Sequence, residues 1–484
     1  MEASLQLERS VFPEDTIEKN VIGMASIDAK FDESPEMDRK PVHIVGVIDI
    51  STSMSDGKLA LVKASLSFII DQLSSQDTLG LVQFGNTATK VLSLTKMTND
   101  GKIYAKTKID RIRPIGSTNL SAGLLMGLNL INEDITTLSL NNEDTEEAKR
   151  YTLMLFTDGE ANMGIYNPTE LRKALISYIG VHAERVQILG FGFGREHNVE
   201  MIQDICSLTP SSEYYYIQDR ESIGPQFAEC LGGMLSLVAQ NVKLTILRDD
   251  DHYDIIKIWK SLTENSLPSD EDGFVVNIGD LYREQRKDII FTFRTNQSSI
   301  TLKAMVSYYD VLNETTTTQD LRLEVSFTEG SDAIINWDVR KNYHRVLVAE
   351  CMKNAIMLAE TDLNAAKQSI RNCITFLEGE TGGEEMTLML IEDLEACLRG
   401  MADYNEYFTI GKSCLHTYSS SHANQRSSHY TTAYQDGLVS ELMHSEAYLN
   451  ASNAIPEDIE DLSTPSSARS RNLSASYAPS TRII

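Results

Sequence analysis

An apolar run that stops on an aspartate constrains this chain more than any other feature. Residues 44–48 read Ile-Val-Gly-Val-Ile, and Asp49, Ser51 and Ser53 follow at alternate positions. Five uncharged, mostly apolar residues in a row predict a strand buried on both faces, as in a parallel sheet. The carboxylate and two hydroxyls at its end can face one point above the sheet edge, and Mg²⁺ prefers such oxygen ligands. The same pattern also fits a strand that runs into an ordinary polar turn.

Two later segments favour the metal-binding interpretation. Residues 114–119 form a glycine-containing loop that supplies the Thr118 hydroxyl, and residues 153–157 form a second apolar run that leads into Asp158. Ligands of open α/β sheets collect at the carboxyl ends of the strands, so these segments should meet at one edge. The predicted metal ligands are Asp49, Ser51, Ser53, Thr118 and Asp158, and the predicted loop residues around them are Gly116, Ser117, Asn119 and Gly159.

This ordered set resembles the metal-ion-dependent adhesion site of von Willebrand factor type A domains, over about residues 41–238. The resemblance implies that the three hydroxyls contact one Mg²⁺ or Mn²⁺ directly or nearly so. It implies that the two aspartates act largely through water or exchange places as direct ligands. An octahedral ion then keeps one position for an Asp or Glu carboxylate of another protein. The implied function is a metal-dependent protein–protein interaction module, and the implied class is not an enzyme.

The patterning of the chain changes several times along its length. Strand and helix patterns alternate over residues 41–238, which predicts a doubly wound parallel sheet of the Rossmann-like type, with an exposed loop at about residues 132–147. The flanking segments are predicted as N-terminal strands at 1–40, a β-sandwich at 239–330 that these strands complete, a helical region at 331–410, and a serine-rich disordered tail at 411–484. The α/β domain would then be an insertion between sandwich strands.

The region after residue 238, which includes Ile278–Tyr282, also resembles known proteins. It is similar to the sandwich and helices that follow type A domains in intein-linked and plant ubiquitin-ligase-associated proteins. Such architectures can carry a RING finger, but the six cysteines here form no Cys-x-x-Cys pair. The alternative function is therefore a non-catalytic adaptor or scaffold of the ubiquitin pathway.

Charge and hydropathy narrow the choice of partners and compartment. The 484 residues carry 43 basic and 70 acidic side chains, for a formal net charge of −27. This balance disfavours nucleic acid and anionic membranes, because phosphate binding depends on clustered Lys and Arg. The N-terminal residues lack the apolar core of a signal peptide, and no stretch approaches the length of a membrane span. We therefore expect a cytoplasmic protein.

Two enzyme classes and one inactive state compete with the binding module. Phosphotransferases of the haloacid dehalogenase type need a second aspartate two residues after the first, where this chain has Ser51. A Ser–His–Asp hydrolase would need a Gly-x-Ser-x-Gly turn after a strand, which the sequence lacks. His43 precedes the first apolar run and is better explained as the start of a strand than as a base. A scaffold whose site no longer recruits a ligand stays open.

Overall fold

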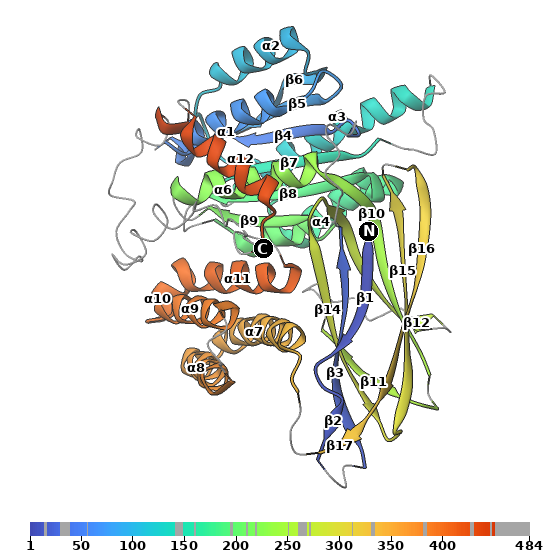
Figure 1. Ribbon diagram of the computed structural model, residues 1–484. Coiled ribbons are helices and arrows are strands. Elements are labelled where there is room, and N and C mark those ends of the chain that lie inside the picture. Colours follow the sequence, from blue (N-terminus) through green and yellow to red (C-terminus); the bar gives the residue numbers. More distant parts are fainter. Residues whose placement is uncertain are drawn as a thin grey trace, which may run out of the picture.

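The protein was analysed as a computed structural model, in which an α/β part, a β-sandwich and a set of helices adjoin one another (Figure 1). The described residues are 1–13, 17–29, 39–55, 57–140, 149–158, 161–193, 197–209, 212–217, 220–249, 251–259, 269–270, 273–311, 313–330, 334–380, 385–425, 430–445 and 448–450. Gly159, one of the predicted loop residues, lies outside them.

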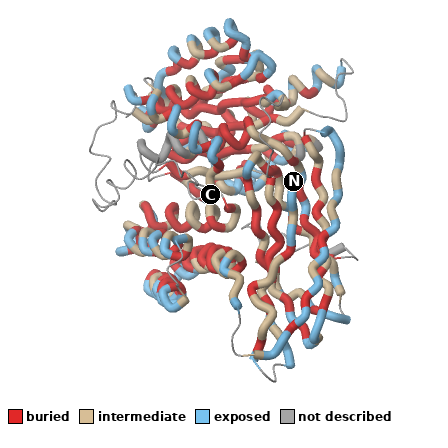
Figure 2. The backbone as a smooth tube through the Cα atoms, viewed as in Figure 1, coloured by how far each residue is buried: buried red, intermediate tan, exposed pale blue. Residues whose placement is uncertain are grey.

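A mostly parallel sheet lies at the centre of the α/β part. Its strands, in spatial order, are β6 (Ala88–Lys96), β5 (Thr78–Phe84), β4 (His43–Asp49), β7 (Tyr151–Thr157), β8 (Val186–Phe193) and β9 (Glu213–Ile217). Only β6 is antiparallel to its neighbour in this described sheet. All seven residues of β4 are buried, as expected for a strand covered on both faces (Figure 2). The predicted Rossmann-like fold class is confirmed.

Helices cover both faces of this sheet. One face packs against α1 (Lys58–Gln72), α2 (Asn99–Asp110) and α6 (Arg220–Leu235), and the other packs against α3 (Leu120–Leu140), α4 (Pro168–Ile179) and α5 (Val199–Cys206). Short turns η1 (Thr52–Met54) and η2 (Gly180–Arg185) complete the connections. Residues 132–140 belong to α3, which corrects the predicted loop there, because Ile135 continues the buried stripe of that helix. Residues 141–148 are not described.

The β-sandwich consists of two antiparallel sheets. One contains β1 (Glu2–Leu7), β3 (Lys19–Asp28), β14 (Arg286–Thr295) and β11 (Asp254–Ile258), in that order. The other contains β12 (Ser269–Asp270), β13 (Gly273–Tyr282), β10 (Leu237–Leu247), β15 (Ser299–Asp310) and β16 (Thr315–Ser326). A small parallel pair joins β2 (Val11–Phe12) to β17 (Thr328–Glu329). Alternate residues of both sheets, such as Ile27, Phe291, Leu244 and Leu302, form the shared core.

The N-terminal strands lie in the same sheet as strands from much later in the chain. All ten residues of β3 pair with β14, from Lys19 opposite Thr295 to Asp28 opposite Arg286. The α/β part is therefore inserted between strands of the sandwich: in the sequence it follows β3 and precedes β10 (Figure 1).

The described chain after residue 336 is helical. It contains α7 (Trp337–Ala359), α8 (Leu363–Glu380), α9 (Glu385–Arg399), α10 (Tyr404–Glu406), the π-helical turn η3 (Tyr407–Gly411), α11 (Lys412–Asn424) and α12 (Ala433–His444). The predicted disorder from residue 411 is wrong for α11 and α12. Composition misled the prediction, because buried serines in α11 find backbone partners: the Ser419 hydroxyl donates to the Ala349 carbonyl at 2.9 Å. Residues 451–484 lie outside the described chain.

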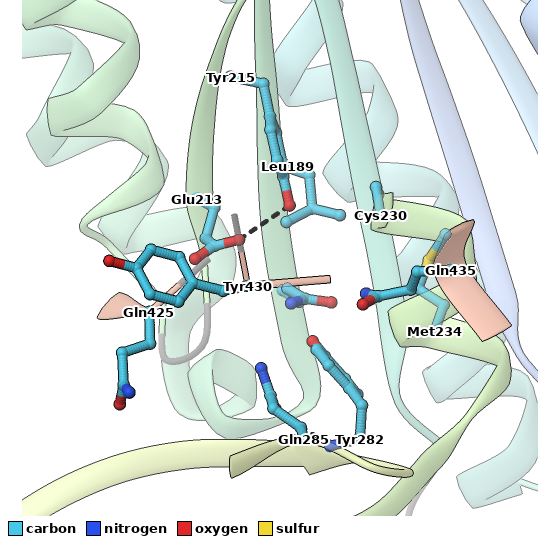
Figure 3. Close-up of a pocket in the computed structure, with 11 residues that line it drawn as sticks. Leu189, Glu213, Tyr215, Cys230, Met234, Tyr282, Gln285, Gln425, Tyr430 and Gln435 are labelled. Atoms are coloured by element: carbon cyan, nitrogen blue, oxygen red, sulfur yellow. Dashed lines mark hydrogen bonds between the residues drawn. The ribbon is translucent and has the colours of Figure 1, made fainter. Parts of the chain in front are cut away.

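The last two helices join the three parts together. Helix α12 packs against α6, and α11 packs against α7 and reaches β9. At this junction a water-sized cavity of about 20 Å³ is lined by side chains from all three parts, among them Gln285, Gln425 and Gln435 (Figure 3). Glu213 accepts a hydrogen bond from the Tyr215 hydroxyl at 2.8 Å beside it. Polar side chains thus meet where the parts join, which matches the polar character of interfaces between domains of one chain.

Candidate metal site at the carboxyl edge of the central sheet

Two neighbouring parallel strands bring the predicted aspartates to one edge. β4 and β7 pair in register from His43 opposite Tyr151 to Ile48 opposite Phe156. Asp49 therefore ends its strand beside Thr157, and Asp158 follows directly. Asp49 is fully buried and Asp158 is 5% exposed, so both carboxylates lie in a low-dielectric region at the top of the sheet.

A continuous chain of hydrogen bonds joins four of the five predicted ligands. One Asp49 oxygen accepts from the Ser51 backbone N–H at 2.8 Å, and the other accepts from the Thr157 hydroxyl at 2.6 Å. The Ser51 and Ser53 hydroxyl oxygens lie 3.0 Å apart. The Ser53 hydroxyl donates to Asp158 at 2.8 Å. The alternate spacing along the η1 turn therefore places both serine oxygens between the two carboxylates.

The fifth predicted ligand, Thr118, lies on a loop that is fastened to both aspartate loops. The Thr52 backbone N–H donates to the Gly116 carbonyl at 3.1 Å, which joins this loop to the Asp49 turn. The Thr118 backbone N–H donates to the Asn162 side chain at 3.0 Å, and the Asn162 N–H donates back to the Thr118 carbonyl at 3.1 Å. The Thr118 hydroxyl has no hydrogen-bond partner among the described residues, so its oxygen is available to a ligand.

Glycine is required at position 116. Its φ of +87° lies in the left-handed region, and a Cβ there would come within 2.5 Å of the Asn86 amide oxygen. That oxygen accepts from the Ser117 N–H at 2.7 Å. Asn119 caps the start of α3, since its side-chain oxygen accepts from the Ala122 N–H at 3.1 Å. The predicted loop residues 116, 117 and 119 thus position Thr118 through backbone and capping contacts.

Burial disfavours the charge of one carboxylate of the site, and the other carboxylate is paired with a lysine. Burial raises the pKa of Asp49 to about 6, although hydrogen bonds from Thr157 and Ser51 oppose this rise, and the nearby Asp158 adds to it. The Lys58 ammonium lies 2.5 Å from the second oxygen of Asp158. Lys58 begins α1 directly after Gly57, whose φ is +86°.

Sequence reasoning missed three residues of this site: Lys58, Thr157 and Asn162. Thr157 directly precedes Asp158, Asn162 follows it by four residues, and Lys58 follows Ser53 by five residues. Their proximity to the predicted ligands was a usable signal. Their partners, up to 108 residues away, were not visible before the fold was known.

Comparison with known proteins identifies this part of the chain. The sequence profile of the von Willebrand factor type A domain matches residues 43–228. The chain carries a von Willebrand factor type A domain. The matched range begins at β4 and ends within α6, so it includes every strand of the central sheet and all five predicted ligands.

Curated relatives extend the comparison beyond the type A domain. The chain is 26% identical to the E3 ubiquitin-protein ligase WAV3 of Arabidopsis thaliana over 264 residues, which are 53% of this chain and 31% of WAV3. It is 26% identical to the inter-alpha-trypsin inhibitor heavy chain H3 of Pongo abelii over 167 residues, which are 34% of this chain and 18% of that protein. The chain therefore matches less than a third of the length of each relative.

A solved structure shares the wider architecture. A von Willebrand factor type A protein from Catenulispora acidiphila superposes with a TM-score of 0.60, covering 89% of this chain and 97% of that one, at 13% identity. At this identity the likeness concerns the fold alone. Coverage of 89% shows that the likeness extends past the type A domain.

The donor set of the type A domain fits a hard divalent cation. Two buried carboxylates, two serine hydroxyls and the available Thr118 hydroxyl are all oxygen ligands, which suit Mg²⁺ and Mn²⁺ better than softer metals. Among the described residues, no group of three or more His, Cys, Asp or Glu side chains could hold a metal. The described residues therefore form no soft-metal or all-carboxylate site, and the oxygens at this edge come from hydroxyls as well as carboxylates.

The other candidates of the sequence analysis lie away from this edge. His43 begins β4 at the opposite edge of the sheet, where its Nδ1 lies 2.9 Å from the Thr78 hydroxyl. No helix in the described part of the chain combines the length and apolarity needed to span a membrane.

Proposed function

We propose that the chain is a divalent-metal-dependent interaction module that binds an Asp or Glu carboxylate of a partner protein. The observation that carries the proposal is the buried pair Asp49 and Asp158, bridged by Ser51 and Ser53 beside the available Thr118 hydroxyl. A bound Mg²⁺ or Mn²⁺ would supply a Lewis-acidic site for the incoming carboxylate. Asp49, Ser51, Ser53, Thr118 and Asp158 would hold it.

Two features of the site and the charge of the chain determine how an anionic partner would bind. Hydrogen bonds from Thr157 and Ser51 orient the buried Asp49 carboxylate within the site. Ser53 is exposed and sits between the buried oxygens and the surface, at the entry side of the site. This chain has a net charge of −27, which repels a partner carboxylate. The carboxylate is attracted only where a bound cation offsets the negative potential locally. The proposed binding is therefore strictly metal-dependent.

The test is partner capture by the immobilised full chain, with Mg²⁺ and with EDTA. We expect Thr118→Ala to weaken capture by about 2–5 kcal/mol, because loss of the metal would remove the buried charge pair between the metal and the partner carboxylate. Thr89→Ala, which removes an exposed hydroxyl from β6, is the matched control and should leave capture unchanged. Capture that ignores both EDTA and Thr118→Ala would refute the proposal.

A second function is favoured by the extent of one match. The similarity to WAV3 covers 264 residues, whereas the type A profile covers residues 43–228. We infer a role as an adaptor of a ubiquitin ligase, in which this chain presents a protein through the metal site and performs no transfer itself. Reconstituted ubiquitylation tests it: the chain alone should transfer no ubiquitin, and substrate modification by a bound ligase should fall with Thr118→Ala. Transfer by the chain alone would contradict the adaptor role.

A further inference from the structure

A cavity of about 540 Å³ lies at the opposite edge of the central sheet from the metal site. Its walls come from the starts of β4, β5, β7 and β8 and from the strands β10, β13 and β15 of the sandwich. It therefore lies where the type A domain meets the sandwich (Figure 1). Its volume falls within the roughly 300–1,000 Å³ of small-molecule sites.

Cationic side chains dominate the described lining of this cavity. The positively charged residues are Arg39, Lys40, Lys96, Lys149, Arg150 and Arg185, and the only carboxylate among the described lining residues is Asp280. In a chain with a net charge of −27, this concentration of positive charge runs against the overall composition. Composition disfavours extended polyanions as partners, but it does not exclude a small anion in a local positive site.

Ion pairs with carboxylates hold two of these side chains in the wall. Arg39 contacts both oxygens of the buried Asp77, at 2.8 and 2.5 Å. Arg150 reaches Asp280 of the sandwich at 3.2 Å. Because each guanidinium has five N–H donors, these pairs orient the groups and leave donors for a ligand.

Two lysines of the wall also form ion pairs with carboxylates. Lys149 lies 3.3 Å from Asp134, and Lys40 lies 2.9 Å from Glu314. Lys96 has no ion-pair partner within the described ranges. Four of the six cations in the wall thus have a carboxylate partner among the described residues. Burial and then the nearby Lys149 lower the pKa of His43 to about 4, so this lining imidazole adds no charge at pH 7.

The rest of the wall can accommodate an uncharged organic group. Tyr151, Tyr282 and Tyr309 line the cavity together with Leu235 and Val311. Aromatic and aliphatic walls with a few convergent charged groups are typical of sites for small organic ligands. The cavity therefore offers both a cationic place for a negatively charged group and a surface for a larger neutral body.

We propose that this cavity binds a small phosphorylated metabolite, with a dianionic phosphate monoester among the lysines and arginines and its organic body against the tyrosines. Arg and Lys form strong charge-assisted hydrogen bonds with phosphate, and six such side chains line this cavity. The site is separate from the metal site, since it lies at the amino-terminal edge of the same strands. A ligand here would contact the type A domain and the sandwich at once.

Titration calorimetry on the full chain in EDTA tests the proposal, because the chelator keeps phosphate away from any metal. The probes are adenosine 5′-monophosphate, ribose 5-phosphate, inorganic phosphate, adenosine and a phosphoserine peptide. We expect saturable binding of at least one organic phosphate, with inorganic phosphate about tenfold weaker and adenosine weaker still. The double variant Lys96→Gln/Lys149→Gln should weaken that binding at least tenfold.

The matched control is Lys90→Gln/Lys173→Gln, which removes two exposed lysines of the type A domain outside the cavity and should change affinity less than twofold. The proposal is overturned if no organic phosphate binds saturably, if the cavity and control variants weaken binding equally, or if inorganic phosphate binds as tightly as the organic compounds. Tighter binding of the phosphoserine peptide would show a peptide site instead of a metabolite site.

Discussion

At the scale of single residues, the ligand oxygens of the site could be predicted from the sequence, whereas the long-range contacts that hold them could not. The spacing of Asp49, Ser51 and Ser53 was enough to predict that their oxygens converge, and the structure links them by hydrogen bonds to Asp158. The ion pair between Lys58 and Asp158 joins positions 100 residues apart, so no local sequence pattern predicts it. Local chemistry was predictable there, and long-range pairing was not.

Lys58 should compete with a metal for Asp158. Its ammonium, 28% exposed, contacts an oxygen that a divalent ion or its water shell would use. We expect Lys58→Gln to lower thermal stability in EDTA, because Asp158 loses its cation, and to tighten Mn²⁺ binding severalfold. Calorimetric titration with Mn²⁺ measures this, with Lys102→Gln on α2 as the control. Weaker Mn²⁺ binding in Lys58→Gln would show that the lysine assists the site.

Asp77 gives the chain a stability that depends on pH. Burial alone would raise its pKa, but hydrogen bonds from Arg39, Val42 and Ser74 outweigh burial and hold the pKa below its usual value. A depressed carboxyl pKa stabilises the fold above the unfolded-state pKa of about 3.9, and this contribution is lost as pH falls through the lower folded value. The pair therefore contributes fully at pH 7 and fades below about pH 4.

The variant Asp77→Asn should consequently cost about 1–3 kcal/mol of unfolding free energy at pH 7, since partly exposed Arg39 can be hydrated after the change. Urea unfolding at pH values from 7 down to 3 measures the difference from wild type. The difference should shrink below pH 4. A difference that is constant over this range would mean that the carboxylate charge is not what stabilises β5.

At the scale of elements, the strands and most helices followed their hydrophobic periods, while α11 and α12 did not. Helix α11 is rich in Ser, and the buried positions of the two helices include Ser413, Ser419 and Gln435. The Ser419 hydroxyl, for example, finds its partner on α7, at the Ala349 carbonyl, and a single sequence does not show such a contact. Thr432 and Gln435 also form a capping box at the start of α12, which was the local signal for that helix.

Substitutions at two glycines distinguish the packing of α12 against α6 from the intrinsic helical stability of α12. Gly232 of α6 faces Gln435, and a Cβ there would come within 2.6 Å of the Gln435 Cγ, whereas a Cβ at the exposed Gly437 of α12 would meet nothing within 4 Å. We expect Gly437→Ala to stabilise the chain by about 0.5–1 kcal/mol through helix propensity. Gly232→Ala should instead destabilise it by about 1–3 kcal/mol, as overpacking does.

Urea unfolding of the two variants provides the measurement, and each glycine serves as the control for the other. Equal stabilisation by both substitutions would show that α12 does not pack closely on α6 in solution.

At the scale of the whole molecule, the type A domain is inserted between strands of the sandwich. β3 comes before the type A domain and β14 comes after it, yet they pair over ten residues. The orphan N-terminal strands and the change to a period of two after residue 241 pointed to this arrangement in the sequence. The boundaries of the domains stay predictions, and the return of the last helices onto α6 and β9 could not be predicted, because it depends on tertiary contacts between polar surfaces.

Removing residues 1–28 should therefore damage the sandwich although the type A domain is untouched. β14 would lose its ten-residue partner and expose a row of unpaired backbone groups, which is a hazard for aggregation. We expect the shortened chain to aggregate at concentrations at which the full chain stays monodisperse in light scattering. A monodisperse shortened chain with an unchanged melting temperature would show that these strands are dispensable.

The most direct test of the account is whether the full chain gains stability from a divalent ion through Asp49, Ser51, Ser53, Thr118 and Asp158. A ligand that binds only the folded state adds about 2.7 kcal/mol at a free concentration one hundred times its Kd. Melting temperatures of wild type and Asp158→Ala should be measured in EDTA, in Mg²⁺ and in Mn²⁺, with Ca²⁺ for comparison. The account predicts a higher melting temperature for wild type in Mg²⁺ or Mn²⁺ and no response from Asp158→Ala. Equal melting temperatures of wild type with and without the ions would contradict it.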